Sequence, residues 1–232
     1  MQIKTILDQI DINAMALPEF QRGYVWNREQ VRGLMYSLYR KHPVGSLLVW
    51  VTKTDNADAR GDQTLQPGSV KLLLDGQQRI TSLYGLIRGK PPKFFDGDKQ
   101  SFTGLYFNLE TETFEFYAPT KMRDDPLWIS VTEMMADDTG PVMQKLLQTP
   151  ALAPKLATYL GRMNDVSNIR AIDLHIEEVA GEDKTVDVVV DIFNRVNSGG
   201  TKLSKGDLTL ARICAQWPQA RDEMKRLTCP HE

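Results

Sequence analysis

The clearest periodicity in the chain lies in residues 28–40. Apolar side chains recur there at the 3.6-residue spacing of one helix face: Val31, Leu34, Met35 and Leu38. Asn27 stands directly before this segment, and Gln30 lies three residues further on, which is the spacing of a capping box at the start of a helix. The pattern predicts an amphipathic helix with one buried face.

Two short apolar segments after this helix predict buried strands, at residues 46–51 and 70–74. The polar stretch between them, residues 52–68, predicts a loop. A leucine-spaced segment over residues 77–88 predicts a second helix, which ends at Gly89 because glycine favours the left-handed conformation at a helix C-terminus.

The middle of the chain predicts a hairpin and a broken helical segment. Apolar and polar residues alternate over residues 105–109 and 113–117, which predicts two strands joined by a short turn. Residues 141–164 have a helical pattern that is interrupted at Pro150 and Pro154.

The last third of the chain predicts one strand and three helices. Residues 168–176 alternate as a strand would, and the charged residues 177–184 predict a loop. An apolar helix is predicted over residues 186–196, and two shorter helices over residues 208–217 and 219–227.

Composition limits the class of protein. The chain has 232 residues, 41% of them hydrophobic, which is enough for a substantial core. Its formal net charge of −2 lacks the basic excess of a dedicated nucleic-acid coat, so any DNA contact would be local. Cys214 and Cys229 have no paired spacing, and we therefore expect no metal held by cysteine. No apolar run approaches membrane-spanning length and the first residues form no signal core, so we expect a cytoplasmic protein with reduced thiols and no membrane contact.

The most informative polar residues follow the strand predicted at 70–74. Asp75, Gly76, two glutamines and Arg79 stand where that strand gives way to the next helix. The N–H groups of a helix's first turn lack intrahelical acceptors and the helix dipole is positive there, so such a junction favours an anion such as phosphate. Gly76 permits close backbone approach and Arg79 offers a fork of donors, whereas Asp75 is better suited to a metal ion, a water or a ribose hydroxyl. The alternative is a polar turn with a solvated arginine.

Three segments share this chemistry: residues 20–26, 75–79 and 193–201. Each combines an arginine with amide side chains and glycine at the boundary of a predicted element. The aromatic residues of the first segment could instead face a core, and Arg195 of the third could simply complement a helix dipole. The chain contains neither G-x-x-x-x-G-K-[ST] nor G-x-G-x-x-G, which excludes a Walker-type or Rossmann nucleotide site.

The order and the amino-acid sequences of the three segments resemble those of the N-terminal domain of the GmrSD family of modification-dependent restriction enzymes. That family carries F-Q-R-x-Y-x-W, D-G-Q-Q-R and F-x-R-x-N-S-G-G-T-x-L-S motifs, which match Phe20 to Trp26, Asp75 to Arg79 and Phe193 to Ser204. The similarity spans residues 17–212.

The resemblance implies an α+β fold of the ParB/sulfiredoxin type, a small mixed sheet with flanking helices followed by a helical portion. Residues 1–120 would form the nucleotide-binding core, and residues 121–232 a mainly helical portion packed on it as one unit. The resemblance also implies a domain that binds and hydrolyses a nucleoside triphosphate with Mg²⁺, and that regulates DNA restriction in antiviral defence.

The resemblance also implies roles for individual residues. Asp75 is the expected metal ligand and, with Arg79, the expected catalytic residue. The expected nucleotide-binding residues come from all three motifs: Gln21, Arg22, Gly76, Gln77, Gln78, Arg79, Asn194, Arg195, Asn197, Ser198, Gly199 and Gly200. We therefore expect the third motif to face the second across one triphosphate.

Two alternatives to an NTPase stay open at this point: a nucleotide sensor that does not hydrolyse its ligand, and a ParB-fold DNA nuclease. Members of the family usually carry a C-terminal HNH nuclease domain, and we expect no HNH site in this chain because His231 is the only late histidine. A nuclease domain or subunit outside this chain would then bind the DNA. We also expect that the protein can form a homo-oligomer.

Overall fold

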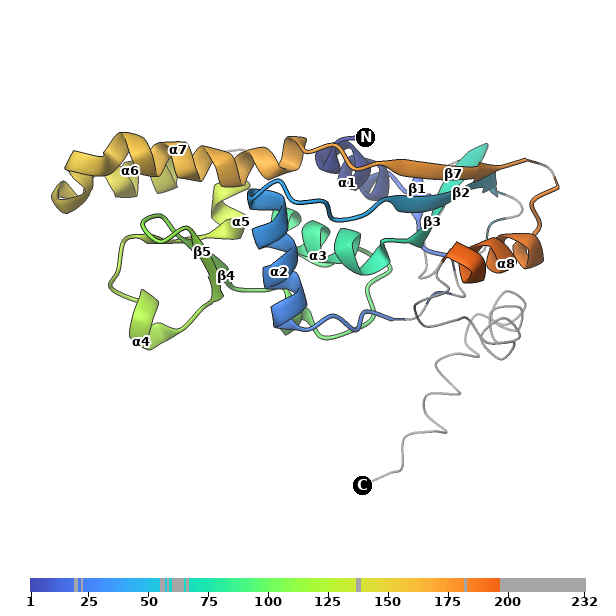
Figure 1. Cartoon of the computed structure of the whole chain (residues 1–232), viewed down its shortest axis with the longest axis horizontal. Coiled ribbons are helices and arrows are strands. Elements are labelled where there is room, and N and C mark those ends of the chain that lie inside the picture. The colour runs from blue at the N-terminus through green and yellow to red at the C-terminus, as the bar shows by residue number, and fades with distance from the viewer. Residues whose placement is uncertain are drawn as a thin grey trace, which may run out of the picture. The chain divides into compact units, whose positions relative to one another are not determined.

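The computed structural model describes residues 1–18, 21, 23–54, 57, 59, 65, 67–136, 139–181 and 183–196. They belong to two compact units whose segments alternate along the chain. The first unit comprises residues 1–11, 23–46 and 76–175, and the second comprises residues 12–22, 47–75 and 176–232. Helices and sheets occur together, which confirms the predicted α+β class (Figure 1). The boundary expected at residue 120 stays a prediction.

The first unit is mainly helical in the part of the chain that the structure describes. Its helices, in chain order, are α1 (Ile3–Asp11), α2 (Arg28–Tyr39), α3 (Gln77–Arg88), α4 (Pro119–Met122), α5 (Val131–Met134), α6 (Gly140–Leu147) and α7 (Leu156–Ser167), with 3-10 turns η2 (Lys99–Ser101), η3 (Pro150–Lys155) and η4 (Asn168–Ala171). Its strands are β4 (Leu105–Asn108), β5 (Thr113–Phe116) and β6 (Trp128–Ser130), in the order β5-β4-β6.

Several local predictions for this unit are confirmed. The capping box at Asn27 and Gln30 is present, and α2 buries its predicted apolar face. Helix α3 ends at Gly89 in the left-handed conformation, with φ of 67°. Strands β4 and β5 pair antiparallel as a hairpin, with Leu105 opposite Phe116.

The second unit contains the sheet whose strand β3 ends at Asp75, the first residue of the second motif. Its strands are β1 (Met15–Ala16), β2 (Leu47–Lys53), β3 (Ser69–Asp75) and β7 (Ile176–Ala180), in the order β1-β3-β2-β7, and they are followed by helix α8 (Val186–Val196). Strand β2 runs antiparallel to β3 and parallel to β7.

Helix α8 covers one face of this sheet. Its buried residues Val189, Val190 and Phe193 share one hydrophobic cluster with side chains from three strands: Ala16, Leu48, Trp50, Val70, Leu72 and Leu74. The even-numbered positions of β3 all face this cluster, because successive strand residues point to opposite faces.

The strand predicted at residues 168–176 is wrong. Residues 168–171 continue from α7 as the turn η4, where Ile169 is buried, and the strand lies at residues 176–180. Glu177 and Glu178 made this segment resemble a loop. Pairing with β2 nevertheless makes it a strand, and Glu178 forms an ion pair with Lys71 of β3. Long-range pairing thus outweighs local composition.

The helices predicted at 208–217 and 219–227 lie outside the described residues. Among the described helices, none has the length and apolar character needed to cross a membrane.

Candidate functional site

Glycine makes the turn from β3 into α3. Strand β3 ends at Asp75, Gly76 adopts the left-handed conformation with φ of 91°, and α3 begins at Gln77. A residue with a Cβ would be strained at this φ, so the sharp turn depends on glycine. As a glycine, the N-cap residue Gly76 supplies no side-chain acceptor of its own to α3. The predicted strand-to-helix junction is therefore present.

The side chain of Gln78 joins the first motif to α3 through three hydrogen bonds. Its Oε1 accepts hydrogen bonds from the backbone N–H groups of Val25, at 2.9 Å, and Trp26, at 3.2 Å. Its Nε2 donates to the carbonyl oxygen of Gly23, at 3.2 Å. The side chain is buried, and these three bonds use its acceptor and donor ends together. Gln78 was expected to serve a phosphate, and the structure gives its side chain this internal role.

Tyr24 provides a second link to α3. Its hydroxyl shares a hydrogen bond of 2.8 Å with Ser82, and its ring packs against Phe95 and Phe102 with centroid separations of 5.6 and 5.7 Å. Burial raises the pKa of Tyr24 from 10.0 to about 12, and the Ser82 hydrogen bond opposes part of this rise. Tyr24 thus belongs to the core, as the alternative interpretation of the first motif proposed for its aromatic residues.

Gln21 of the first motif contacts the end of strand β3, within the second unit. Its Nε2 donates to the carbonyl oxygen of Leu74 at 2.7 Å, one residue before Asp75, and its side chain is buried. The first motif therefore contacts the second motif at Gln78, within the first unit, and the residue before Asp75, within the second unit. Arg22, between these contacts, lies outside the described residues.

Arg79 is not the solvated arginine of the alternative interpretation. Its Nη1 donates to the carbonyl oxygen of Val44 at 2.5 Å, and its Nη2 donates to that of Ser46 at 2.7 Å. Between these two residues Gly45 has φ of 83°, and a Cβ there would lie 2.9 Å from Arg79 Nη1. The guanidinium is partly buried and holds residues 44–46. Nothing in the sequence indicated this contact, because backbone carbonyl acceptors leave no sequence signal.

The third motif is described only up to Val196. Phe193 is buried in the same cluster as Leu74, whereas Arg195 is 79% exposed and pairs with Asp191 at 2.7 Å. Asn194 is half-buried. Asn197, Ser198, Gly199 and Gly200 lie outside the described residues, so the expected meeting of the second and third motifs stays a prediction.

Within the second unit, the course of α8 is consistent with that expectation. The helix begins beside the end of the sheet formed by Lys53 and Ser69, and it runs back along the sheet (Figure 1). Its eleven residues span about 16 Å, close to the length of β2 from Lys53 to Leu48. Leu48 pairs with Asp75. Asn194 and Arg195 thus lie toward the end of the sheet where β3 reaches Asp75.

Comparison with known proteins identifies the family. The model of the GmrSD restriction endonuclease N-terminal domain matches residues 3–214. The chain belongs to this family. The chain is also similar to the uncharacterized protein MJ0686 of Methanocaldococcus jannaschii, with 27% identity over 244 aligned residues. That alignment covers 86% of this chain and 39% of the relative, so the chain spans well under half the length of that relative.

The candidate metal ligand in this GmrSD-type domain is the single carboxylate of Asp75. In the part of the chain that the structure describes, no cluster of three or more His, Cys, Asp or Glu residues could hold an ion. Mg²⁺ usually keeps several waters and binds through one or two carboxylates together with substrate phosphates. Asp75 is half-buried at the end of β3, and a single carboxylate of this kind fits Mg²⁺ that arrives with a triphosphate.

Proposed function

We propose that this domain binds a nucleoside triphosphate together with Mg²⁺ at the turn between β3 and α3, and hydrolyses it. The observation that carries the proposal is the left-handed Gly76, which starts α3 and has no side chain of its own over the first turn. The first-turn amides and the dipole of a helix stabilise negative charge placed at its N-terminus. A triphosphate is a ligand of that charge, and membership of the GmrSD family supports this assignment.

The residues of the turn would share the work of phosphoryl transfer. The backbone of Gly76, Gln77 and Gln78 would hold phosphate oxygens, because Gly76 carries no side chain that blocks approach. Asp75 would hold the metal and orient a water. Bound Mg²⁺ would supply charge neutralisation on the phosphates. Phosphoryl transfer needs mainly positioning and electrostatics, which this small set of groups can provide.

Arg79 would act on the nucleotide from a fixed position. A guanidinium carries five N–H donors, so one arginine can hold a loop and an anion at once. Its bonds to Val44 and Ser46 restrict the side chain and lower the entropy lost when it binds phosphate. We assign Gln21 the same kind of positioning role, since it orders the backbone at Leu74.

The other expected residues complete the proposal. Arg22, Asn194, Arg195, Asn197, Ser198, Gly199 and Gly200 would hold the nucleotide from the first and third motifs. For the longer protein of which such a domain is a part, we propose modification-dependent DNA restriction, with the nucleotide state controlling a nuclease domain or subunit.

Calorimetry and phosphate release test the proposal separately. Each of the four nucleoside triphosphates is titrated into the purified chain with excess Mg²⁺, and released phosphate is measured in parallel. We expect at least one triphosphate to bind with a dissociation constant in the range of about 1 μM to 1 mM, and to be hydrolysed. Binding without phosphate release would favour the sensing alternative, and no binding by any of the four would overturn the proposal.

A third experiment on the same purified protein measures DNA cleavage. Metal-dependent nicking of DNA by this chain alone, lost in Asp75→Ala, would favour the nuclease alternative over the NTPase. We expect no such nicking.

A further inference from the structure

The first unit contains a cavity at the C-terminus of α2, formed together with the segment that follows η4. The cavity has a volume of about 550 Å³ and is lined by Leu38, Lys41, His42, Pro43, Val44, Gly45, Ile172, Asp173, Leu174 and His175. Leu38 and Leu174 are buried and give it an apolar surface. Sites for small organic molecules are mainly apolar and run from about 300 to 1,000 Å³, so the cavity has the size and lining of such a site.

Three side chains that carry or can gain positive charge line this cavity. Lys41 and His42 come from the end of α2, and His175 comes from a segment more than a hundred residues later. All three are exposed, so a ligand can reach them. Within the described structure, none of the three side chains forms a hydrogen bond or an ion pair. Histidine gains its charge between pH 8 and 5, so the lining becomes more positive as the pH falls through this range.

The other charged and titratable groups around the cavity favour an anion of low charge. Asp173, the carboxylate in the lining, pairs with the α-amino group of Met1 at 3.4 Å. The ring of Tyr36 packs edge-on against His42, with a centroid separation of 6.3 Å. With one lysine, two histidines and this carboxylate, the lining suits a single negative charge better than the several charges of a triphosphate.

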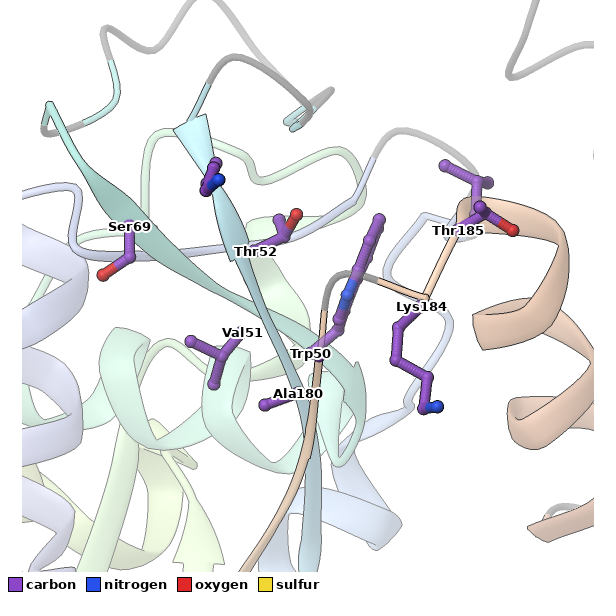
Figure 2. A pocket seen from close by; sticks show the side chains of 10 residues that line it. Trp50, Val51, Thr52, Ser69, Ala180, Lys184 and Thr185 are labelled. Carbon is purple, nitrogen blue, oxygen red and sulfur yellow. The ribbon is translucent and has the colours of Figure 1, made fainter.

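The cavity drawn in Figure 2 shows the contrasting case. It lies in the second unit and is lined by Lys184, whose ammonium group forms an ion pair with Asp183. The cation of that cavity is therefore neutralised within the chain, whereas Lys41 is not. This difference makes the cavity of the first unit the better candidate for an anion site.

Lys41 occupies a backbone position that glycine usually takes. Its φ is 57°, and its N–H donates to the carbonyl oxygen of Leu38 at 3.0 Å. The N–H of His42 donates to the carbonyl oxygen of Ser37 at 2.8 Å, which completes a Schellman motif. A lysine in this left-handed position is less stable than glycine. The helix dipole favours a cation at this end, but Arg40 already supplies one at the C-cap. Residues held in such unfavourable conformations cluster at ligand sites, and this one places a charge at the cavity.

Both segments that form the cavity are held in place by hydrogen bonds. Arg79 holds residues 44–46 through two backbone carbonyls, and its guanidinium lies beside Gly45. The N–H of Ile3 donates to the carbonyl oxygen of Ile172 at 3.0 Å. A site built on fixed segments loses little entropy when a ligand binds.

We propose that this cavity binds an organic anion that combines one carboxylate with an apolar, ring-sized body. The carboxylate would pair with the charges of Lys41, His42 and His175, and the body would lie against Leu38 and Leu174. The site does not depend on nucleotide binding at the β3–α3 turn. Its ligand would contact the segment that Arg79 holds, because residues 44 and 45 line the cavity.

The test uses phenylacetate and 2-phenylethanol, two probes of similar shape that differ in charge, without nucleotide or Mg²⁺. The chain has three histidines, and the ring signals of His42 and His175 in proton NMR spectra are assigned by their loss in His42→Gln and His175→Gln. We expect phenylacetate to shift both signals and to bind about tenfold more tightly than 2-phenylethanol at pH 6. The preference should fall to about threefold at pH 8, where the histidines are neutral, and each histidine variant should reduce this pH dependence.

Lys41→Gly separates the binding role of Lys41 from a structural one. Glycine adopts the left-handed conformation without strain, so this variant should melt about 1–3 °C higher than the parent. It should nevertheless bind phenylacetate about threefold more weakly, with 2-phenylethanol unaffected. Lys145→Gln, which removes an exposed lysine of α6, is the control and should change neither probe.

Three results would overturn the proposal. The first is that phenylacetate up to about 10 mM leaves the signals of His42 and His175 unmoved at pH 6. The second is equal binding of the two probes by the parent protein at that pH. The third is parental affinity for phenylacetate in Lys41→Gly.

Discussion

Arg79 serves the fold directly, whatever its part in nucleotide binding. Its two hydrogen bonds to Val44 and Ser46 are made by a charged group, and such bonds are stronger than neutral ones. We predict that Arg79→Ala lowers the free energy of unfolding by about 1–2 kcal/mol and weakens triphosphate binding by about 2–4 kcal/mol. Urea titration and calorimetry measure the two effects. Arg123→Ala, which alters an exposed arginine of the same unit, is the control and should change neither.

Substitution of Asp75 should affect triphosphate hydrolysis and triphosphate binding differently. Asp75→Asn keeps the shape of the side chain but removes the charge needed to hold a metal or polarise a water. We predict that turnover falls by roughly 10²-fold or more while nucleotide affinity is kept or raised. Phosphate release and calorimetry on the same preparation provide the comparison, with Asp124→Asn as an exposed control. Parental turnover in Asp75→Asn would exclude Asp75 from catalysis.

Ionisation of Tyr24 makes the free energy of unfolding depend on pH in the alkaline range. Its pKa is 10.0 when unperturbed and about 12 in the folded protein, because burial disfavours the phenolate. The stabilising contribution is therefore complete below pH 10 and is lost as the pH rises from about 10 to 12. We predict that the free energy of unfolding falls over this interval, and that Tyr24→Phe reduces the slope. Tyr36→Phe should leave the slope unchanged, since Tyr36 is exposed. Equal slopes for parent and Tyr24→Phe would contradict the assignment.

At the scale of elements, the contact between the first motif and α3 depends on Gln78. Removing its side chain leaves the N–H groups of Val25 and Trp26 and the carbonyl of Gly23 without their partners. An unsatisfied buried group costs about 1–3 kcal/mol, so we predict that Gln78→Ala destabilises the protein by about 2–4 kcal/mol. Denaturant unfolding gives the value. Gln144→Ala, on an exposed helix surface, should cost less than about 0.5 kcal/mol.

The elements that could be predicted from the sequence depend on local signals. The capping box of α2, the glycine that ends α3 and the alternation of β4 and β5 act within a few residues, and all three are present in the structure. Strand β7 could not be predicted, because its register comes from β2, more than a hundred residues earlier. The internal bonds of Gln78 and Arg79 could not be predicted for the same reason. Their polar character indicated a site, but their backbone partners are set by the tertiary fold.

At the scale of the whole molecule, the three motifs belong to a domain of the GmrSD family. The family model spans residues 3–214, while the relative from Methanocaldococcus jannaschii is matched over 39% of its length. Our central proposal for this domain is that a nucleoside triphosphate binds where β3 passes into α3.

Hydrogen–deuterium exchange in the presence of Mg²⁺, with and without the triphosphate that calorimetry selects, tests this claim most directly. A phosphate that accepts hydrogen bonds from the first turn of α3 protects those amides from exchange. We predict slower exchange in peptides that cover residues 76–80, and in residues 23–26, which Gln78 holds against α3. A triphosphate that binds by calorimetry but leaves exchange at residues 76–80 unchanged would contradict the account.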